Sequence, residues 1–195
     1  MRTVIGIDPG LASTGWGVVR FDGSRFLHVG HGVVTTDPGT PLAQRLLHIH
    51  HEISRIISAH RPTEAGVEDL VFARNATSAI HVAHARGVVL LALGQGGINV
   101  GTYSPQQVKQ AVIGRGKAAK DQVQRLVAVV LGLEEIPGPD HAADALAVAV
   151  CHANRSDWNA RQEAAEPRAR GDVSRRDVGH RYGTRRRGPR HANVQ

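Results

Sequence analysis

The sequence predicts an α/β domain in which a five-stranded mixed sheet is flanked by helices. The first 35 residues hold three runs rich in β-branched residues, separated by turns that contain glycine, which is typical of an antiparallel meander. Two more short apolar runs follow, each preceded by a longer segment with apolar residues at helical spacing. A meander followed by alternating helices and strands indicates a sheet with both antiparallel and parallel pairs.

The individual elements follow from the same patterns. Strands are expected at about residues 3–8, 14–21 and 25–35. Thr40 and Pro41 start a helix that ends near His60, because apolar side chains recur every three or four residues between them. The other expected elements are strands at 65–69 and 97–103 and helices at 75–94, 105–113, 118–131 and 140–153.

Charge divides the chain into two parts. The whole sequence carries a formal net charge of +7, and residues 155–195 hold eleven arginines, no lysine and five acidic residues. The apolar residues of that segment are few and show no regular spacing, so the segment is too polar to form a hydrophobic core. We therefore expect one folded domain at 1–154 and a disordered, Arg-rich tail at 155–195. The tail either attracts phosphates, a salt-sensitive interaction, or only keeps the chain in solution.

The single cysteine bears on the compartment. Cys151 lies in an apolar helical segment and has no second cysteine with which to form an internal disulfide, which fits a reducing cytoplasm. The sequence contains neither a recognisable secretory signal nor an apolar stretch of transmembrane length. We expect a cytoplasmic protein.

Two carboxylates stand where expected strands end. Asp8 closes the apolar run of the first strand, and the Pro9-Gly10 pair turns the chain directly after it. Glu68 ends the short apolar run of the fourth strand. A carboxylate at a strand end points into the crevice where α/β sheets place their sites. Each residue taken alone is equally well read as a turn cap or a solvated strand end.

A third carboxylate and an imidazole lie at the start of the last expected helix. His141 and Asp144 are three residues apart, so they share one helical face. By itself His141 is more simply explained by capping or exposure. Three carboxylates and one imidazole from three elements together describe a divalent metal site.

Six ordered segments of the chain form a recognisable set: GIDPG at 6–10, TGWGVV at 14–19, VEDLVFARNATSA at 67–79, ARGVV at 85–89, VKQAVIGRGKAAKDQV at 108–123 and HAADALAVAV at 141–150. With these segments the chain resembles the RuvC family of Holliday-junction resolvases over residues 3–153. GIDPG alone is unspecific, but the ordered set with its separations is specific. The resemblance implies a ribonuclease H-like fold.

The resemblance also implies a catalytic site of four residues that cleaves phosphodiesters with two metal ions. Asp8 is expected to bridge the metals, Glu68 to complete one, and His141 with Asp144 to complete the other. Two Mg²⁺ ions are the default cofactor. Many family members carry an acidic residue where this chain has His141, and imidazole favours Mn²⁺ over Mg²⁺.

Four of the basic residues that follow the fifth expected strand are candidate contacts to DNA. Lys109 and Lys120 fall on family positions that contact phosphate near the active site. Arg115 and Lys117 flank glycines in a loop that lets the backbone approach DNA. Any one of these side chains is also readily explained as part of a solvated face, and Lys120 has Asp121 and Asp140 as candidate partners.

The loop after Glu68 is a second candidate DNA contact. Relatives often carry an aromatic pair there that pushes against bases at the junction point, and this chain has Val71-Phe72. Only Phe72 of this pair can stack on a base, and it is otherwise a core residue. Arg74 and Asn75 are expected to contact the DNA backbone, with Asn75 alternatively the cap of the next helix.

The resemblance implies partners as well. They are four-way junction DNA, a second copy of the chain in a homodimer, and the branch-migration proteins RuvA and RuvB. The helix at 75–94, with Ala76, Ala79, Ala83 and Ala85, is a candidate dimer face, although packing on the sheet also explains its small residues.

Three other functions remain open from the sequence. An actin-like ATPase shares the GIDPG pattern, but it needs two copies of the fold, for which this chain is too short. A non-catalytic nucleic-acid-binding module is a second alternative, although Asp8, Glu68 and Asp144 are all retained. A nuclease of the same fold that cuts another structured nucleic acid, such as RNA, is the third.

Overall fold

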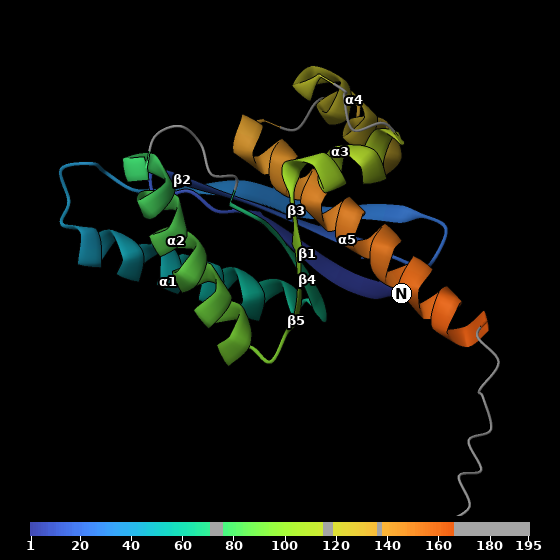
Figure 1. Ribbon diagram of the computed structural model, residues 1–195, viewed down its shortest axis with the longest axis horizontal. Coiled ribbons are helices and arrows are strands. Elements are labelled where there is room, and N and C mark those ends of the chain that lie inside the picture. Colours follow the sequence, from blue (N-terminus) through green and yellow to red (C-terminus); the bar gives the residue numbers. More distant parts are fainter. Residues whose placement is uncertain (71–75, 115–118, 136–137, 166–195) are drawn as a thin grey trace, which may run out of the picture. The chain divides into compact units, whose positions relative to one another are not determined.

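The computed structural model describes residues 1–70, 76–114, 119–135 and 138–165 (Figure 1). In chain order the elements are β1 (Arg2–Asp8), β2 (Ser13–Phe21), β3 (Phe26–Thr35), α1 (Leu42–His60), β4 (Glu64–Glu68), α2 (Ala76–Gln95), β5 (Asn99–Tyr103), α3 (Pro105–Ile113), α4 (Lys120–Leu131) and α5 (Asp140–Ala165). The predicted fold class, element types and element order are confirmed. Every boundary lies within two residues of its expected place, except the end of α5.

The five strands form one sheet in the order β3-β2-β1-β4-β5. The pairs β1–β2 and β2–β3 are antiparallel, whereas β1–β4 and β4–β5 are parallel. Strand β1 is therefore central, and its last residue, Asp8, lies opposite Gly15 of β2. The carboxyl ends of β1, β4 and β5 meet at one edge of the sheet, as parallel pairing requires.

Each face of the sheet is covered by its own helices. One core contains Ile5, Ile7 and Val18 of the sheet with Ile49 and Ile53 of α1, and it extends to α2. The opposite core places strand residues such as Val4 and Val19 against α3, α4 and α5. Figure 1 shows α1 beside α2, and α3 and α4 beside the first turns of α5. Burial on both sides explains why β1 reads as a continuous apolar run.

Glycines let α5 lie unusually close to the sheet. A Cβ atom at Gly6 would overlap the backbone of Ala145, and one at Gly15 would overlap the carbonyl oxygen of His141. At Gly17 it would collide with the side chain of Leu146. These glycines set the height of α5 over β1 and β2, and thereby the distance between the helix start and the end of β1.

A polar network fixes the far part of α5. His152 is buried, its Nε2 lies 3.0 Å from Glu64 Oε2, and its Nδ1 lies 3.0 Å from the Tyr103 hydroxyl. Arg2 donates to Glu64 Oε1 at 3.1 Å. Burial lowers the pKa of His152, only partly opposed by the Glu64 carboxylate. Burial also opposes ionisation of Glu64, but the Arg2 charge and the hydrogen bonds from His152 and Arg2 hold its pKa below the usual range.

Helix α5 continues to Ala165, twelve residues beyond its expected end at 153. Tertiary contacts hold the next turn. Arg2 donates to the Ser156 hydroxyl at 2.9 Å and to the Ala153 carbonyl oxygen at 3.3 Å, and the Arg155 guanidinium lies over the Tyr103 ring. Beyond residue 153 the sequence has no apolar residues at helical spacing, so a continued helix could not be predicted from it. These contacts between distant residues account for the added turn. Met1–Ala165 forms one compact unit.

Among the described residues, none of the helices is long and apolar enough to cross a lipid bilayer.

Candidate metal centre

The four residues expected to form the site do lie at the same edge of the sheet. Asp8 ends β1 and Glu68 ends β4, the two neighbouring parallel strands. His141 and Asp144 lie in the first turns of α5, which the sheet glycines allow to approach. The site is thus assembled from two strand ends and one helix start.

Three of the four residues place donor atoms close together. His141 Nδ1 lies 2.7 Å from Asp8 Oδ2, and one ligand atom each from Asp8, His141 and Asp144 lies within 4.8 Å of the others. The Asp8 side chain is 19% exposed and that of His141 49%, so the group is open to solvent on the His141 side. Two carboxylate oxygens and one imidazole nitrogen fit a divalent cation of the Mg²⁺ or Mn²⁺ type.

Glu68 shares the electrostatic environment of Asp8 and Asp144. Burial, together with the negative charge and hydrogen bond of Asp8 and the charge of Asp144, raises the pKa of Glu68 to about 8. Without a metal the Glu68 carboxyl therefore carries a proton near neutral pH. A carboxyl group whose ionisation is opposed by two neighbouring carboxylates is suited to bind a cation, which supports the interpretation as a metal site.

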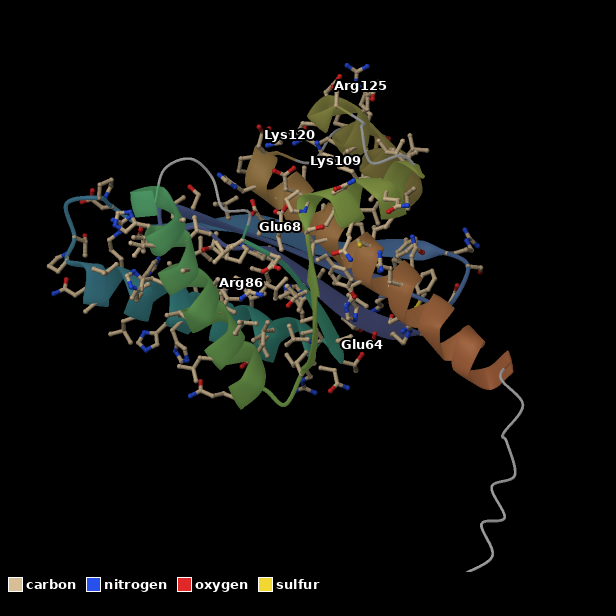
Figure 2. All side chains as sticks on the ribbon, viewed as in Figure 1. Glu64, Glu68, Arg86, Lys109, Lys120 and Arg125 are labelled. Atoms are coloured by element: carbon tan, nitrogen blue, oxygen red, sulfur yellow. The ribbon has the colours of Figure 1, made fainter. Side chains whose placement is uncertain are left out.

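Lys120 of α4 supplies a positive charge beside the same carboxylates. Its Nζ lies 2.9 Å from Asp144 Oδ2 and 3.3 Å from Asp140 Oδ2. Burial lowers the pKa of Lys120, but its hydrogen bonds and charge interactions with Asp144 and Asp140 outweigh that effect and raise it. Pairing with Asp140 is as expected, whereas pairing with Asp144 brings Lys120 into the site itself. Figure 2 shows Glu68, Lys109 and Lys120 at one end of the sheet and Glu64 at the other.

Two residues that hold groups of the site in position were not predicted from the sequence. Gln124, buried in α4, donates its amide Nε2 to Asp144 Oδ1 at 3.5 Å. A polar residue in the apolar stripe of α4 is the signal that could have revealed it. Arg86 of α2 lies 3.2 Å from Asp69 Oδ1 and 3.3 Å from Thr102 Oγ1, and so secures the segment that follows Glu68. No local pattern distinguishes Arg86 from a surface arginine.

Several expected DNA contacts lie outside the described residues. In the segment after Glu68 they are Val71, Phe72, Arg74 and Asn75. In the segment after α3 they are Arg115 and Lys117. Lys109 is described, and it lines the same pocket as Glu68, Lys120 and Asp144.

The expected dimer face needs one correction. Ala85 is fully buried against the core and does not belong to an outer face of α2. Ala83 is exposed, as are Ile80 and Leu91, and a Cβ at Gly87 would meet nothing within 4 Å. The outer face of α2 therefore combines these residues with the exposed His81 and His84, and Ala85 alone drops out of the described part of the alanine series predicted from the sequence.

Comparison with known proteins gives consistent matches over the described part of the chain. The family described as crossover junction endodeoxyribonuclease RuvC matches residues 4–152. The RuvC of Treponema denticola is 54% identical over 154 residues, covering 79% of this chain and 86% of that protein. The RuvC of Rubrobacter xylanophilus is 46% identical over 171 residues, covering 88% of this chain and 96% of that protein.

Solved structures of two other proteins also superimpose on this chain. Thermus thermophilus RuvC in complex with a Holliday junction substrate superimposes with a TM-score of 0.79 at 39% identity, covering 82% of this chain and 97% of that one. The yeast mitochondrial Holliday junction resolvase Ydc2 superimposes with a TM-score of 0.57 at 11% identity, over 83% of each chain, which establishes likeness of fold alone.

Proposed function

The chain belongs to the RuvC family of crossover junction endodeoxyribonucleases, and from this membership we propose that it resolves Holliday junctions by paired symmetric nicks in recombination and DNA repair. The observation that carries the proposal is the convergence of Asp8, His141 and Asp144 at the carboxyl edge of the sheet. The 39% identical Thermus relative, whose structure contains a Holliday junction, supports the choice of substrate.

The catalytic residues are Asp8, Glu68, His141 and Asp144. In this proposal Asp8, on the central strand, would bind both cations, Glu68 would complete the binding of one, and His141 with Asp144 would hold the other. Two divalent ions supply an acidified water and positive charge for the leaving oxygen. The nitrogen of His141 favours Mn²⁺ over the usual Mg²⁺.

Basic side chains bind the phosphates around this centre. Lys109 and Lys120 line a pocket with Glu68 and Asp144, so they lie within reach of a phosphate that contacts the carboxylates. Lys120 pairs with Asp144, so a cation held by that carboxylate would leave the Lys120 ammonium available to a phosphate. Arg115, Lys117, Phe72, Arg74 and Asn75 remain proposed contacts to DNA.

The proposal includes two kinds of protein partner. A second copy pairs through the outer face of α2, which carries exposed Ile80 and Leu91 and the open Gly87. Such a homodimer has two sites for two strands of like polarity. RuvA and RuvB deliver the junction. The nuclease domain, expected at 1–154, extends in this proposal to Ala165, where the compact unit ends, and the Arg-rich segment after it adds non-specific attraction to DNA.

A synthetic mobile junction with each strand labelled in turn tests the function. With Mg²⁺ or Mn²⁺ we expect symmetric nicks in two opposite strands, leaving 5′-phosphate and 3′-hydroxyl ends that ligase can seal. Linear duplex and a structured RNA serve as controls and should stay intact. Cleavage of the RNA in preference to the junction would favour a different substrate for the same fold, and binding without metal-dependent cleavage would indicate a non-catalytic module.

A further inference from the structure

Two histidines of strand β3 lie against each other outside the group formed by Asp8, His141 and Asp144. His28 Nε2 lies 2.8 Å from His31 Nδ1, and the two ring centroids are 4.9 Å apart. Both side chains are half-buried. The proposed cleavage chemistry gives this pair of imidazoles no role.

A β-bulge brings the two rings to the same face of the sheet. Residues three positions apart in a regular strand point to opposite faces. The pairing of β2 with β3 shifts between Val18 and Val19, so that Val29 is an additional residue of β3 without a partner on β2. Because of this extra residue, His31 points to the same side as His28.

This side of the sheet is the one that carries α5. His31 lies opposite Gly17, where an added Cβ would collide with Leu146 of α5, and His28 lies opposite Val19, which belongs to the core on that side. Strand β3 is also the edge of the sheet, and both rings are only half-buried. An ion with its bound water can therefore reach the pair from solvent.

The pair suits a cation that prefers nitrogen ligands. Burial and, to a smaller extent, the charge of His31 lower the pKa of His28, so this ring is neutral at neutral pH, the form that binds metal. Within the described part of the chain, no third histidine, cysteine or carboxylate joins the pair around a common point. Mg²⁺ and Ca²⁺ require oxygen ligands, whereas imidazole suits Zn²⁺, Cu²⁺ and Ni²⁺.

The distance between the two nitrogens distinguishes among these ions. With metal–nitrogen bonds of about 2.0–2.1 Å, nitrogens at neighbouring corners of a square or an octahedron are about 2.9 Å apart, whereas tetrahedral positions are about 3.3 Å apart. The observed separation of 2.8 Å matches the first arrangement. Square-planar and tetragonal sites are typical of Cu²⁺ and Ni²⁺, and tetrahedral sites of Zn²⁺.

We propose that His28 and His31 bind one late transition-metal ion, Ni²⁺ or Cu²⁺, with water at the remaining positions. In the ion-free pair one ring donates its N–H to the other, and the tautomers decide which ring is the donor. On binding, solvent carries that proton to the outer nitrogen of the same ring. His28 Nε2 and His31 Nδ1 then both bind the ion. This site is separate from the proposed function and does not depend on it.

Equilibrium dialysis of the full chain against Ni²⁺ tests the site. Excess Mg²⁺ is present throughout, because it competes for carboxylates but not for a pair of imidazoles. His28→Gln and His31→Gln should each lower the bound Ni²⁺ by one equivalent per chain. The double variant should lose the same single equivalent and not two, because both rings share one ion.

The matched control lies on α1. His48→Gln combined with His51→Gln removes two exposed imidazoles that are three residues apart, and this protein should keep the Ni²⁺ equivalent. Thermal melts in EDTA show that each variant is folded. Added Ni²⁺ should then raise the melting temperature of the unaltered protein more than that of His28→Gln, because only the folded pair binds the ion.

Three results would overturn the inference. The first is unchanged Ni²⁺ binding in either single variant. The second is a loss of two equivalents in the double variant, since each ring would then hold its own ion. The third is an equal loss in the α1 control, which would show that Ni²⁺ binds histidines of this chain without selection. If only one single variant folds, that variant decides. Junction cleavage with Mg²⁺ is tested separately, so none of these results bears on the proposed function.

Discussion

His141 Nδ1 lies 2.7 Å from Asp8 Oδ2, although the two residues are 133 positions apart in the sequence. In the absence of metal, an imidazole N–H at Nδ1 donates to the Asp8 carboxylate and holds both side chains in place. A cation bound by this pair would take the place of that proton. As proposed metal ligands, Asp8 and His141 already lie side by side, and we expect metal affinity to depend on pH because imidazole binds metal only in its neutral form.

Replacement of Asp8 tests the bridging role. Asp8→Asn removes the central negative charge but keeps the shape of the side chain, so cleavage should fall roughly a thousandfold or more while junction binding persists. Single-turnover cleavage and a gel-shift titration in Ca²⁺ measure the two quantities. A variant that cuts at a near-native rate would show that Asp8 is not a metal ligand.

Replacement of His141 tests the metal preference. Because imidazole favours Mn²⁺, the unaltered protein should cut faster with Mn²⁺, and His141→Asp should lower the Mn²⁺-to-Mg²⁺ rate ratio by about tenfold. Mild acid should also slow the unaltered protein more than the variant. Cleavage rates of both proteins are compared with each metal across pH.

The alternative role for His141 is to orient or deprotonate the attacking water. In that case the Mn²⁺-to-Mg²⁺ ratio would be the same in the two proteins, while the acid sensitivity of the unaltered protein would remain.

The raised pKa of Glu68 predicts how metal-free stability depends on pH. The folded-state pKa of about 8 lies above the ordinary value of 4.5, so between these values the folded protein binds more protons than the unfolded chain. Stability in EDTA should therefore decrease as pH rises from about 4.5 to 8. Glu68→Gln removes the buried charge and should raise the melting temperature at pH 8 by several degrees.

Thermal melts at pH 6 and pH 8, with and without Mg²⁺, check this prediction. Added Mg²⁺ should stabilise the unaltered protein more than Glu68→Gln. A melting temperature that is equal in both proteins at pH 8 in EDTA would contradict the buried, proton-binding state of Glu68.

The network around His152 should contribute to stability without touching the site. His152→Leu leaves the Tyr103 hydroxyl buried without its partner and should cost about 1–3 kcal/mol of unfolding free energy. A double-mutant cycle with Tyr103→Phe should give non-additive losses, because the two side chains share a hydrogen bond. Urea titrations provide the free energies, and strictly additive losses would argue against the bond.

The same network predicts acid sensitivity. Burial lowers the pKa of His152 below the ordinary value of 6.5, so the unfolded chain binds the proton more tightly. Stability should therefore fall as pH drops below about 6.5, and His152→Leu should weaken that part of the dependence.

Truncation at Ala165 tests the tail. An end at Arg155 would remove Ser156, which accepts a hydrogen bond from Arg2, whereas an end at Ala165 keeps the compact unit complete. Residues 166–195 contain nine arginines, so the truncated protein should fold and cut but bind junctions with a salt slope shallower by about 1–2 or more. A full-length variant with these arginines changed to glutamine is the control. Equal slopes for all three proteins would show that the tail does not contact DNA.

The sequence by itself determined the order and type of the elements. Strand β1 reads as a β-branched run that ends in Asp8-Pro9-Gly10, and α1 has apolar residues at helical spacing over its whole length. These are local patterns, which depend on residues a few positions apart. The carboxylates of the site were also visible, because Asp8 and Glu68 end strands whose parallel pairing brings their carboxyl ends together.

Contacts between distant residues were decided only by the tertiary structure. The pairing of Lys120 with Asp144, the amide of Gln124 beside that carboxylate and the burial of Ala85 all depend on how two helices meet, which no local period encodes. The turn of α5 that follows residue 153 is held by Arg2, from the other end of the chain. The physical reason is that local propensity fixes the type of an element, whereas its ends and its ionic partners are fixed by long-range burial and hydrogen bonding.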